Sequence, residues 1–465
     1  MPLSRWMEQY QRGDYAGVIA DAEKLTAATA TSAVALRLAG QAAAKLAQPL
    51  LAATYFLRAA QCSDVSSASH GESLANAGLM LARAGRPDAA TLAWLSDLRL
   101  STHRSAHSVS VRQLFEHFSD RVDAQLACLA TAVHSPAHFH PFFPVFLQQL
   151  DSCDVDAPKR PVPRPAMTGP ISVIVCSHRE DRFARFSAEC AHAFAGDDVE
   201  IVRIDDARFM GDGYRRGMAS ARGEWLLFTH DDIELLSPEF ARRVRESFAG
   251  ADVFFPVGSA ALAGPAWFSA GPAYLRGAVT LPSAAPGACD VAWCGVVRPD
   301  ESMALGDGFF IGAHRGVAHA IGWDGDPDDG FHGYDLSFTC RAARSGVRVR
   351  AATRLQILHY SLGDFDANWL STAGRVCVRH AIPGGPARSA QWVRRNGIPR
   401  QDAVALFDRV ADWLDAAPAA LEGLIQDALG GCVQEAASVG PTGDSVNRVV
   451  ELLRAVVSQP AALRG

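Results

Sequence analysis

Arg222-Gly-Glu-Trp-Leu-Leu-Phe-Thr-His-Asp-Asp-Ile-Glu-Leu-Leu-Ser-Pro-Glu239 is the stretch that decides the fold. Its apolar run from Trp225 to Phe228 predicts a buried strand, and Pro238 is predicted to open the next helix. Asp231 and Asp232 follow the strand directly. Two such carboxylates repel each other and resist desolvation, so they need a cation or a helix N-terminus. A hard divalent metal shared with substrate phosphates would satisfy them. The alternative is a loop whose aspartates cap the helix after Pro238.

Composition describes a chain with room for two or three domains, because it has 465 residues of which 49% are hydrophobic. Its net charge is −6, and no basic stripe stands out, which argues against general nucleic-acid binding. The basic residues are almost all arginine, and alanine is abundant. This composition is typical of a GC-rich bacterial genome.

Cysteine usage and hydropathy suggest a soluble, cytoplasmic protein. The ten cysteines include no CxxC pair, so the sequence does not support a zinc site and predicts reduced thiols. The N-terminus has no apolar signal core. Prolines and glycines interrupt the long uncharged run 253–275, so we expect no transmembrane helix there.

Residues 1–150 are rich in alanine and leucine with helical periodicity. Three similar breaks, Arg12-Gly-Asp-Tyr15, Leu46-Ala-Gln-Pro49 and Ala84-Gly-Arg-Pro87, are 34 and 38 residues apart. This stretch resembles tetratricopeptide (TPR) repeats, which form an all-α domain and bind peptides or protein partners in a groove. The alternative is a helical cap that packs on the rest of the chain or forms a homodimer.

The remaining boundaries come from composition. Residues 151–170 are proline-rich and are predicted to be a linker. Residues 371–465 are predicted to begin with an irregular stretch to Pro399 and to continue as a helical C-terminal extension. We expect that extension to pack on the preceding domain or on a second subunit.

Residues 171–370 are predicted to form an α/β domain with a parallel sheet, because apolar strands alternate with helices. The predicted strands 171–177, 199–204 and 225–228 each end in polar residues. Ligands bind beyond the carboxyl ends of such strands. We therefore expect 177–179, 205–206 and 230–232 to converge on one crevice.

The same order of motifs resembles the GT-A-fold (Rossmann-like), family 2-like glycosyltransferases. Ala221-Arg-Gly-Glu224 is similar to the family's helix ending, and His230-Asp-Asp232 stands where the family has Asp-x-Asp. The histidine is similar to the branch named for a streptomycin-cluster glycosyltransferase. Four later segments also resemble that branch: 257–268, 305–311, 330–346 and 358–369.

The resemblance implies a metal-dependent, inverting transfer of sugar from a nucleotide sugar (UDP-, GDP- or dTDP-linked) to a glycan, lipid-linked or protein acceptor. Mn²⁺ or Mg²⁺ would bind Asp232, with His230 and His359 as further ligands, and imidazole favours Mn²⁺. Asp335 would be the catalytic base. For His359 and Asp335 the alternative is a capping role at a strand or helix end.

Nucleotide and sugar contacts are expected from the strand ends and the helix after the second strand. Of Asp205 and Asp206 we favour Asp205, since it ends the strand directly. Asp307 could equally form a tight turn. Arg179 and Arg215 could be ordinary surface arginines, which is the commoner case. Trp267 and Trp293 could stack on sugars, although core packing is the commoner role. The predicted set is Ser177, Arg179, Asp205, Asp206, Arg215, Asp231 and Asp307.

Two other functions fit parts of the sequence. A transferase-fold scaffold that has lost activity and binds partners through its repeats would explain the missing first aspartate. A nucleotidyltransferase shares the sheet and the metal logic, but it would need a glycine-rich phosphate loop with a lysine, which the sequence lacks.

Overall fold

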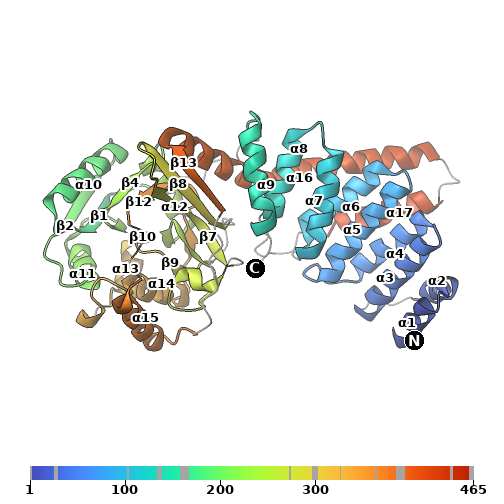
Figure 1. Cartoon of the computed structure of the whole chain (residues 1–465), viewed down its shortest axis with the longest axis horizontal. Coiled ribbons are helices and arrows are strands. Elements are labelled where there is room, and N and C mark those ends of the chain that lie inside the picture. The colour runs from blue at the N-terminus through green and yellow to red at the C-terminus, as the bar shows by residue number, and fades with distance from the viewer. Residues whose placement is uncertain are drawn as a thin grey trace. The chain divides into compact units, whose positions relative to one another are not determined.

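The computed structural model describes residues 3–25, 30–101, 104–133, 139–157, 167–271, 274–295, 302–324, 326–361, 363, 365–383, 393–439 and 444–459. The chain divides into two compact units (Figure 1). Unit 1 comprises Met1–Lys159 and Asp412–Gly465, and unit 2 comprises Arg160–Ala411. All ten cysteines are free thiols. Among the described residues, no helix combines the length and the apolar character needed to cross a bilayer.

The described residues of unit 1 form helices joined by turns, and consecutive helices from α3 to α9 pack against each other. Its alanine-rich segments favour helix and leave little side-chain bulk between neighbouring helices. The N-terminal helices are α1 (Leu3–Gln11), α2 (Tyr15–Glu23), α3 (Ala30–Lys45), α4 (Pro49–Gln61), α5 (Ala68–Arg83), α6 (Pro87–Leu100), α7 (Arg104–His117), α8 (Val122–Val133) and α9 (Phe139–Ser152).

The three sequence breaks are the turns between paired helices, and each contains a residue with positive φ. Gly13 has φ 79°, Ala47 has φ 56° and Gly85 has φ 69°. Only the middle turn uses a residue with a side chain, for which this backbone conformation is strained. Pro49 and Pro87 then start α4 and α6, where a missing N–H costs nothing.

Two of the helix pairs share one packing contact. A Cβ on Gly40 of α3 would lie 2.9 Å from the Phe56 ring of α4. A Cβ on Gly78 of α5 would lie 2.2 Å from the Trp94 indole of α6. Both glycine and aromatic are shifted by 38 residues between the pairs. Each glycine lets a large ring lie against the backbone of the neighbouring helix.

The C-terminal helices differ from the expectation. Helix α17 (Asp444–Val457) packs on α4 and α6 of unit 1 (Figure 1), rather than on the α/β domain. Its apolar stripe, which includes Val446, Val449 and Leu453, is buried there. Arg99 of α6 donates to the carbonyl oxygens of Val457 and Gln459, both at 2.7 Å, and so satisfies the end of α17. Helix α16 (Arg400–Val439) begins in unit 2 and ends in unit 1.

Unit 2 contains two β-sheets flanked by helices (Figure 1). In the first sheet the strand order is β11-β5-β10-β3-β1-β2. In the second it is β13-β8-β7-β12-β4, with β6 paired to β7 and β9. The strands are β1 (Ile171–Cys176), β2 (Val199–Ile204), β3 (Trp225–Thr229), β4 (Ile233–Leu235), β5 (Val253–Phe255), β6 (Val257–Ser259), β7 (Leu275–Pro282), β8 (Ala288–Gly295), β9 (Leu305–Gly306), β10 (Phe310–His314), β11 (Val349–Ala351), β12 (Ile357–His359) and β13 (Val393–Pro399).

The first sheet is mixed, not parallel as predicted. Strands β1, β2 and β3 are parallel, but β10 runs antiparallel between β3 and β5. The direction of β10 is not predictable from its residues, because β10 reads as one more short apolar run. The parallel part nevertheless sets the ends of β1, β2 and β3 at one edge, with Cys176 opposite Ile204 and Val175 opposite Thr229.

The helices of unit 2 connect these strands, and the second sheet extends past residue 370. Strand β13 pairs with β8, so the stretch expected to be irregular up to Pro399 includes a sheet strand and the end of α15. The helices are α10 (Glu180–Ala193), α11 (Met210–Ser220), α12 (Phe240–Gly250), η1 (Trp267–Ala270), α13 (Arg315–Ile321), η2 (Pro327–Asp329), α14 (Tyr334–Arg344) and α15 (Ala367–Arg379).

The opening stretch is strand, loop and strand, not strand and helix. After β3 the chain forms β4, and α12 begins only at Phe240, two residues beyond Pro238. Its N-cap is Glu239, with φ 49° and no side-chain cap bond. Asp231 and Asp232 therefore lie between two strands and cap no helix.

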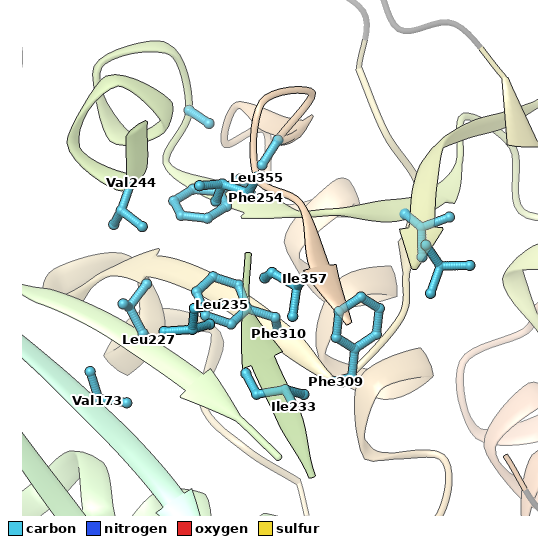
Figure 2. Close-up of a cluster of buried hydrophobic side chains, with 14 of the residues drawn as sticks. Val173, Leu227, Ile233, Leu235, Val244, Phe254, Phe309, Phe310, Leu355 and Ile357 are labelled. Carbon is cyan, nitrogen blue, oxygen red and sulfur yellow. The ribbon is translucent and has the colours of Figure 1, made fainter. Parts of the chain in front are cut away.

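One of the hydrophobic core clusters of unit 2 lies between the two sheets (Figure 2). Val173 and Leu227 project from the first sheet, and Leu235 and Ile357 project from the second. Val244 of α12 packs against this cluster. Burial of these apolar side chains fixes both sheets and, with them, the loops at their ends.

Candidate metal and catalytic site

His230, Asp232 and His359 form a cluster whose potential ligand atoms all lie within 4.8 Å of one another. Strand pairing brings them together: β12 runs antiparallel to β4 with His359 opposite Ile233, the residue after Asp232. His230 Nδ1 is 3.3 Å from His359 Nε2, and Asp232 Oδ1 is 3.7 and 3.5 Å from these two nitrogens. Donors about 2.1 Å from one ion lie about 3.0–3.4 Å apart. A contraction of a few tenths of an ångström would therefore let all three hold a divalent ion.

The protonation states of His230 and Asp232 suit a metal site. Burial lowers the pKa of His230 to about 4, so its imidazole is neutral at pH 7, the form that binds metal. Burial raises the pKa of Asp232, but the hydrogen bond and charge of His359 outweigh this and leave the pKa below its usual value. Two imidazoles and a carboxylate favour Mn²⁺ over Mg²⁺.

Neighbouring aromatic residues hold both histidines in place. The Tyr334 hydroxyl is 2.5 Å from His230 Nε2, leaving Nδ1 directed at the other two ligands. The Phe309 ring stacks on His359 with centroids 4.8 Å apart and planes 17° from parallel. Phe309 belongs to the core cluster of unit 2, so His359 rests on a rigid support (Figure 2).

Asp335 lies beside this cluster in the first turn of α14. The N-cap of α14 is Gly333, so Asp335 is not the cap. One of its carboxylate oxygens accepts a hydrogen bond from the Leu336 N–H at 2.8 Å. Burial, together with the negative charge of Asp307, raises the pKa of Asp335 to about 7. A carboxylate with this pKa is suited to general base catalysis near neutral pH.

The loop before β10 closes the site. Asp307 accepts hydrogen bonds from the Trp267 indole N–H at 2.9 Å and from the Phe309 N–H at 3.3 Å. A Cβ on Gly308 would lie 2.3 Å from the Tyr334 hydroxyl and 2.8 Å from Asp335 Cβ. Only glycine allows this loop to approach the start of α14 so closely. Two hydrogen-bond donors thus hold the Asp307 carboxylate in place. Its negative charge also raises the pKa of Asp335.

A cavity of about 930 Å³ opens over these groups. Its lining includes His230, Asp307, Tyr334, Asp335 and His359. Cavities of about 300–1,000 Å³ bind small molecules and cofactors. Two of the predicted metal residues, His230 and His359, therefore share one cavity with the predicted base, and Asp232 Oδ1 lies 3.7 and 3.5 Å from the two histidines.

Of the seven residues predicted to contact the nucleotide or sugar, Asp307 lines that cavity, and the other six lie outside its lining among the described residues. Ser177 donates to Asp231 at 2.7 Å, which joins the ends of β1 and β3. Asp205 is exposed after β2. The others engage in ion pairs: Arg179 with Asp181, Asp206 with Arg216, and Arg215 with Asp212.

Tyr334 contributes to the site although the sequence predicts no role for it. It stands directly before Asp335 in the segment 330–346, for which the family resemblance implies a role only for the aspartate. Its hydroxyl contact to His230 could not be inferred, because it depends on how α14 meets the end of β3. Trp267 is buried and Trp293 is buried, but only Trp267 reaches the cavity.

Comparison with known proteins gives distant likenesses. No family model matches the chain, and no curated protein matches it. Similar solved structures include GalNAc-T7 with UDP, GalNAc and Mn²⁺, at 10% identity and a TM-score of 0.30. That likeness covers 45% of this chain and 48%, about half, of the other. The mannosyltransferase PcManGT from Pyrobaculum calidifontis, in complex with GDP-Man and Mn²⁺, is similar at 14% identity and a TM-score of 0.30, over 72% of this chain and 97% of that one.

Proposed function

We propose that unit 2 is a GT-A-type glycosyltransferase that moves a sugar from a nucleotide sugar to an acceptor hydroxyl with inversion, in the presence of Mn²⁺ or Mg²⁺. The observation that carries the proposal is the placement of the His230, Asp232 and His359 cluster beside Asp335 at one cavity of about 930 Å³. A set of side chains that can hold a metal ion and a base with a pKa of about 7 are the two features that this reaction needs.

The metal would be held by His230 Nδ1, Asp232 and His359 Nε2. When bound, it would supply positive charge against the diphosphate leaving group. Tyr334 keeps the His230 ring in the orientation that this binding requires.

Asp335 performs the proton transfer. Its carboxylate takes the proton of the acceptor hydroxyl as that oxygen forms a bond to the anomeric carbon of the donor sugar. The bond from this carbon to the phosphate oxygen breaks on the opposite face, and its electron pair leaves with the nucleoside diphosphate. A direct displacement of this kind inverts the anomeric centre, and it places the base on the acceptor side.

The nucleotide is proposed to lie at the ends of β1 to β3, over Ser177, Asp205 and Asp231. Ser177 and Asp231 are already joined by a hydrogen bond, which forms a polar floor there. Arg179, Asp206 and Arg215 border this edge as exposed side chains that can exchange their present ion pairs for nucleotide contacts.

The helices of residues 1–150 are proposed to be TPR-like repeats that bind a protein partner or a second copy of the chain. The recurring glycine–aromatic contact of Gly40 with Phe56 and Gly78 with Trp94 supports a repeat. Repeated helix pairs stack into surfaces that bind extended chains.

The direct test is turnover of UDP-, GDP- and dTDP-sugars with Mn²⁺, measured as release of the nucleoside diphosphate. We expect one donor to be hydrolysed or transferred, and Asp232→Asn to abolish both this activity and the rise in melting temperature that Mn²⁺ gives the wild type. Glu239→Gln, an exposed carboxylate of the same stretch, is the control and should retain both. Equal behaviour of Asp232→Asn and wild type in both measurements would refute the proposal.

A further inference from the structure

The cavity over Asp335 has a wall that differs from the metal corner. It is built from η1, β7 and α15, and among the described residues these elements contribute only uncharged side chains to the lining. Trp267 and Phe268 come from η1, Val279 and Leu281 from β7, and Trp369 from α15. The charged and imidazole groups of the site come from other elements.

Aromatic rings run continuously along this wall. Trp267 meets Phe268 edge to face at 5.6 Å, Phe268 meets Phe365 at 5.3 Å, and Phe365 meets Trp369 at 4.9 Å. Phe365 is 50% exposed and Phe331, also in the lining, is 49% exposed. Large apolar rings left in water beside a cavity are stabilised when a ligand covers them.

Among the described residues, η1, β7 and α15 offer few of the polar groups that bind a sugar; Arg394 of β13, two strands from Val279 in register, also lines the cavity but lies outside this wall. A sugar ring carries several hydroxyls, and each one buried without a partner weakens binding. The Trp267 indole N–H is the polar group that η1 presents there, and it already donates to Asp307. An apolar ligand leaves no polar group unpaired on such a surface.

We propose that this wall binds the apolar body of the acceptor, an alkyl or aryl group, while the hydroxyl that it carries faces Asp335. The inference rests on the proposed glycosyl transfer and specifies its acceptor class: an amphiphile with a hydroxyl head, rather than a free sugar. A cavity of about 930 Å³ has space for such a body beside a donor sugar.

The test compares n-octyl β-glucoside with methyl β-glucoside, which share every hydroxyl and differ only in the apolar chain. Binding is measured by calorimetry on the full chain and needs no turnover. We expect the octyl compound to bind at least about tenfold more tightly. Equal affinities would overturn the inference.

Variants locate the binding. Phe365→Ser and Trp369→Ala should each lower octyl glucoside affinity about tenfold or more, and the two variants guard against one of them misfolding, which melting curves detect. Val378→Ser, an 84% exposed position on the same helix α15 outside the lining, should bind as the wild type does. Tight octyl binding that neither Phe365→Ser nor Trp369→Ala weakens would place the octyl site elsewhere and overturn the inference.

Two further experiments identify the source of the amphiphile and test the apolar site separately from the proposed glycosyl transfer. Sedimentation with phosphatidylcholine vesicles that contain a long-chain glucolipid identifies a membrane-borne amphiphile, and binding of only the soluble octyl compound identifies a free one; both results support the apolar acceptor. Donor hydrolysis by Val378→Ser, which lies outside the lining, should equal that of wild type. If no sugar nucleotide is hydrolysed while octyl glucoside binds as expected, the proposed glycosyl transfer fails and the apolar site stands.

Discussion

Unit 1 and the site of unit 2 are assembled in opposite ways. In unit 1 each of the helices α1 to α9 packs on its neighbours in the sequence, and the contact of Gly40 with Phe56 recurs as Gly78 with Trp94. The site joins the end of β3, the end of β12, the loop before β10 and the start of α14. Local repetition thus specifies unit 1 piece by piece, whereas the site exists only once distant strands have paired in register. A change in unit 1 should act on local stability, and a change in the site should act on chemistry.

The largest effect is expected from Asp335→Asn. The amide keeps the shape of the side chain but cannot accept the proton, so kcat should fall by about 10²–10⁴-fold, the usual contribution of a general base. Acceptor-dependent product formation is the measurement. Asp290→Asn, an aspartate of β8 outside the cavity lining, is the control and should keep the wild-type rate. A loss of less than threefold in Asp335→Asn would remove the base assignment.

The pH dependence of activity and of stability also tests the role of Asp335. Because the pKa of Asp335 is raised to about 7, kcat/KM of the wild type should rise about tenfold per pH unit below 7 and level off above it. For stability the sign is opposite. The folded pKa lies above the unfolded value of 3.8, so this group's contribution is full below pH 4 and is lost as the pH rises through 7. Asp335→Asn should flatten both profiles, and an unchanged stability profile would contradict the raised pKa.

Gly78→Ala tests the other side of the comparison. The new methyl group would lie about where the Trp94 indole is, so we expect α5 and α6 to be destabilised by about 1–3 kcal/mol. Hydrogen exchange of the α5 and α6 amides measures this, and Mn²⁺ binding by unit 2 should not change. Gly40→Ala, where the approach is 2.9 Å instead of 2.2 Å, should cost less. Equal losses of stability in the two variants would show that the distance from the glycine to the aromatic ring does not determine how the helix pairs pack.

Sequence patterns predicted the parts of the molecule that depend on local order. The strands 171–176, 199–204 and 225–229 and the helix start near Asp335 follow from apolar runs and their polar ends. Strand β4, between Asp232 and Pro238, is not predicted because its three residues are too few to show the alternation of a strand. The antiparallel β10 and the contact of α17 with α4 were not predictable, since both depend on long-range pairing that no local pattern encodes.

The candidate site shows the same division. His230, Asp232, His359 and Asp335 were predicted from motif likeness, and the structure brings all four to one place. Their supports were not predicted: the Tyr334 hydroxyl and the Phe309 ring act on residues that lie far from them in sequence. Motifs name the groups that carry chemistry, while the groups that orient them are recognised only from the packing.

Tyr334→Phe tests one such support. The ring keeps its contacts with Tyr214 and Trp323, but His230 Nε2 loses its partner. Loss of a hydrogen bond behind a metal ligand lowers affinity about 10–100-fold, so Mn²⁺ binding, followed by electron paramagnetic resonance, should weaken by about that factor. Tyr274→Phe, at an exposed tyrosine of the same unit, should bind Mn²⁺ as wild type does. Unchanged affinity in Tyr334→Phe would mean that packing alone orients His230.

The smallest effect is expected at the turn between α3 and α4, where Ala47 holds the positive φ that Gly13 and Gly85 hold in the equivalent turns. A left-handed conformation costs a residue with a Cβ about 1–2 kcal/mol, and the greater unfolded-state freedom of glycine offsets about half of this. Ala47→Gly should therefore stabilise α3 and α4 by about 0.5–1 kcal/mol, seen as about two- to fivefold slower hydrogen exchange there. Gly85→Ala is the reciprocal variant, because its Cβ would meet no other atom within 4 Å and only the backbone is strained. It should speed exchange in α5 and α6 by a similar factor. If both substitutions shift exchange in the same direction, the turns are not equivalent, and the local, repeated assembly of unit 1 is wrong at its hinge points.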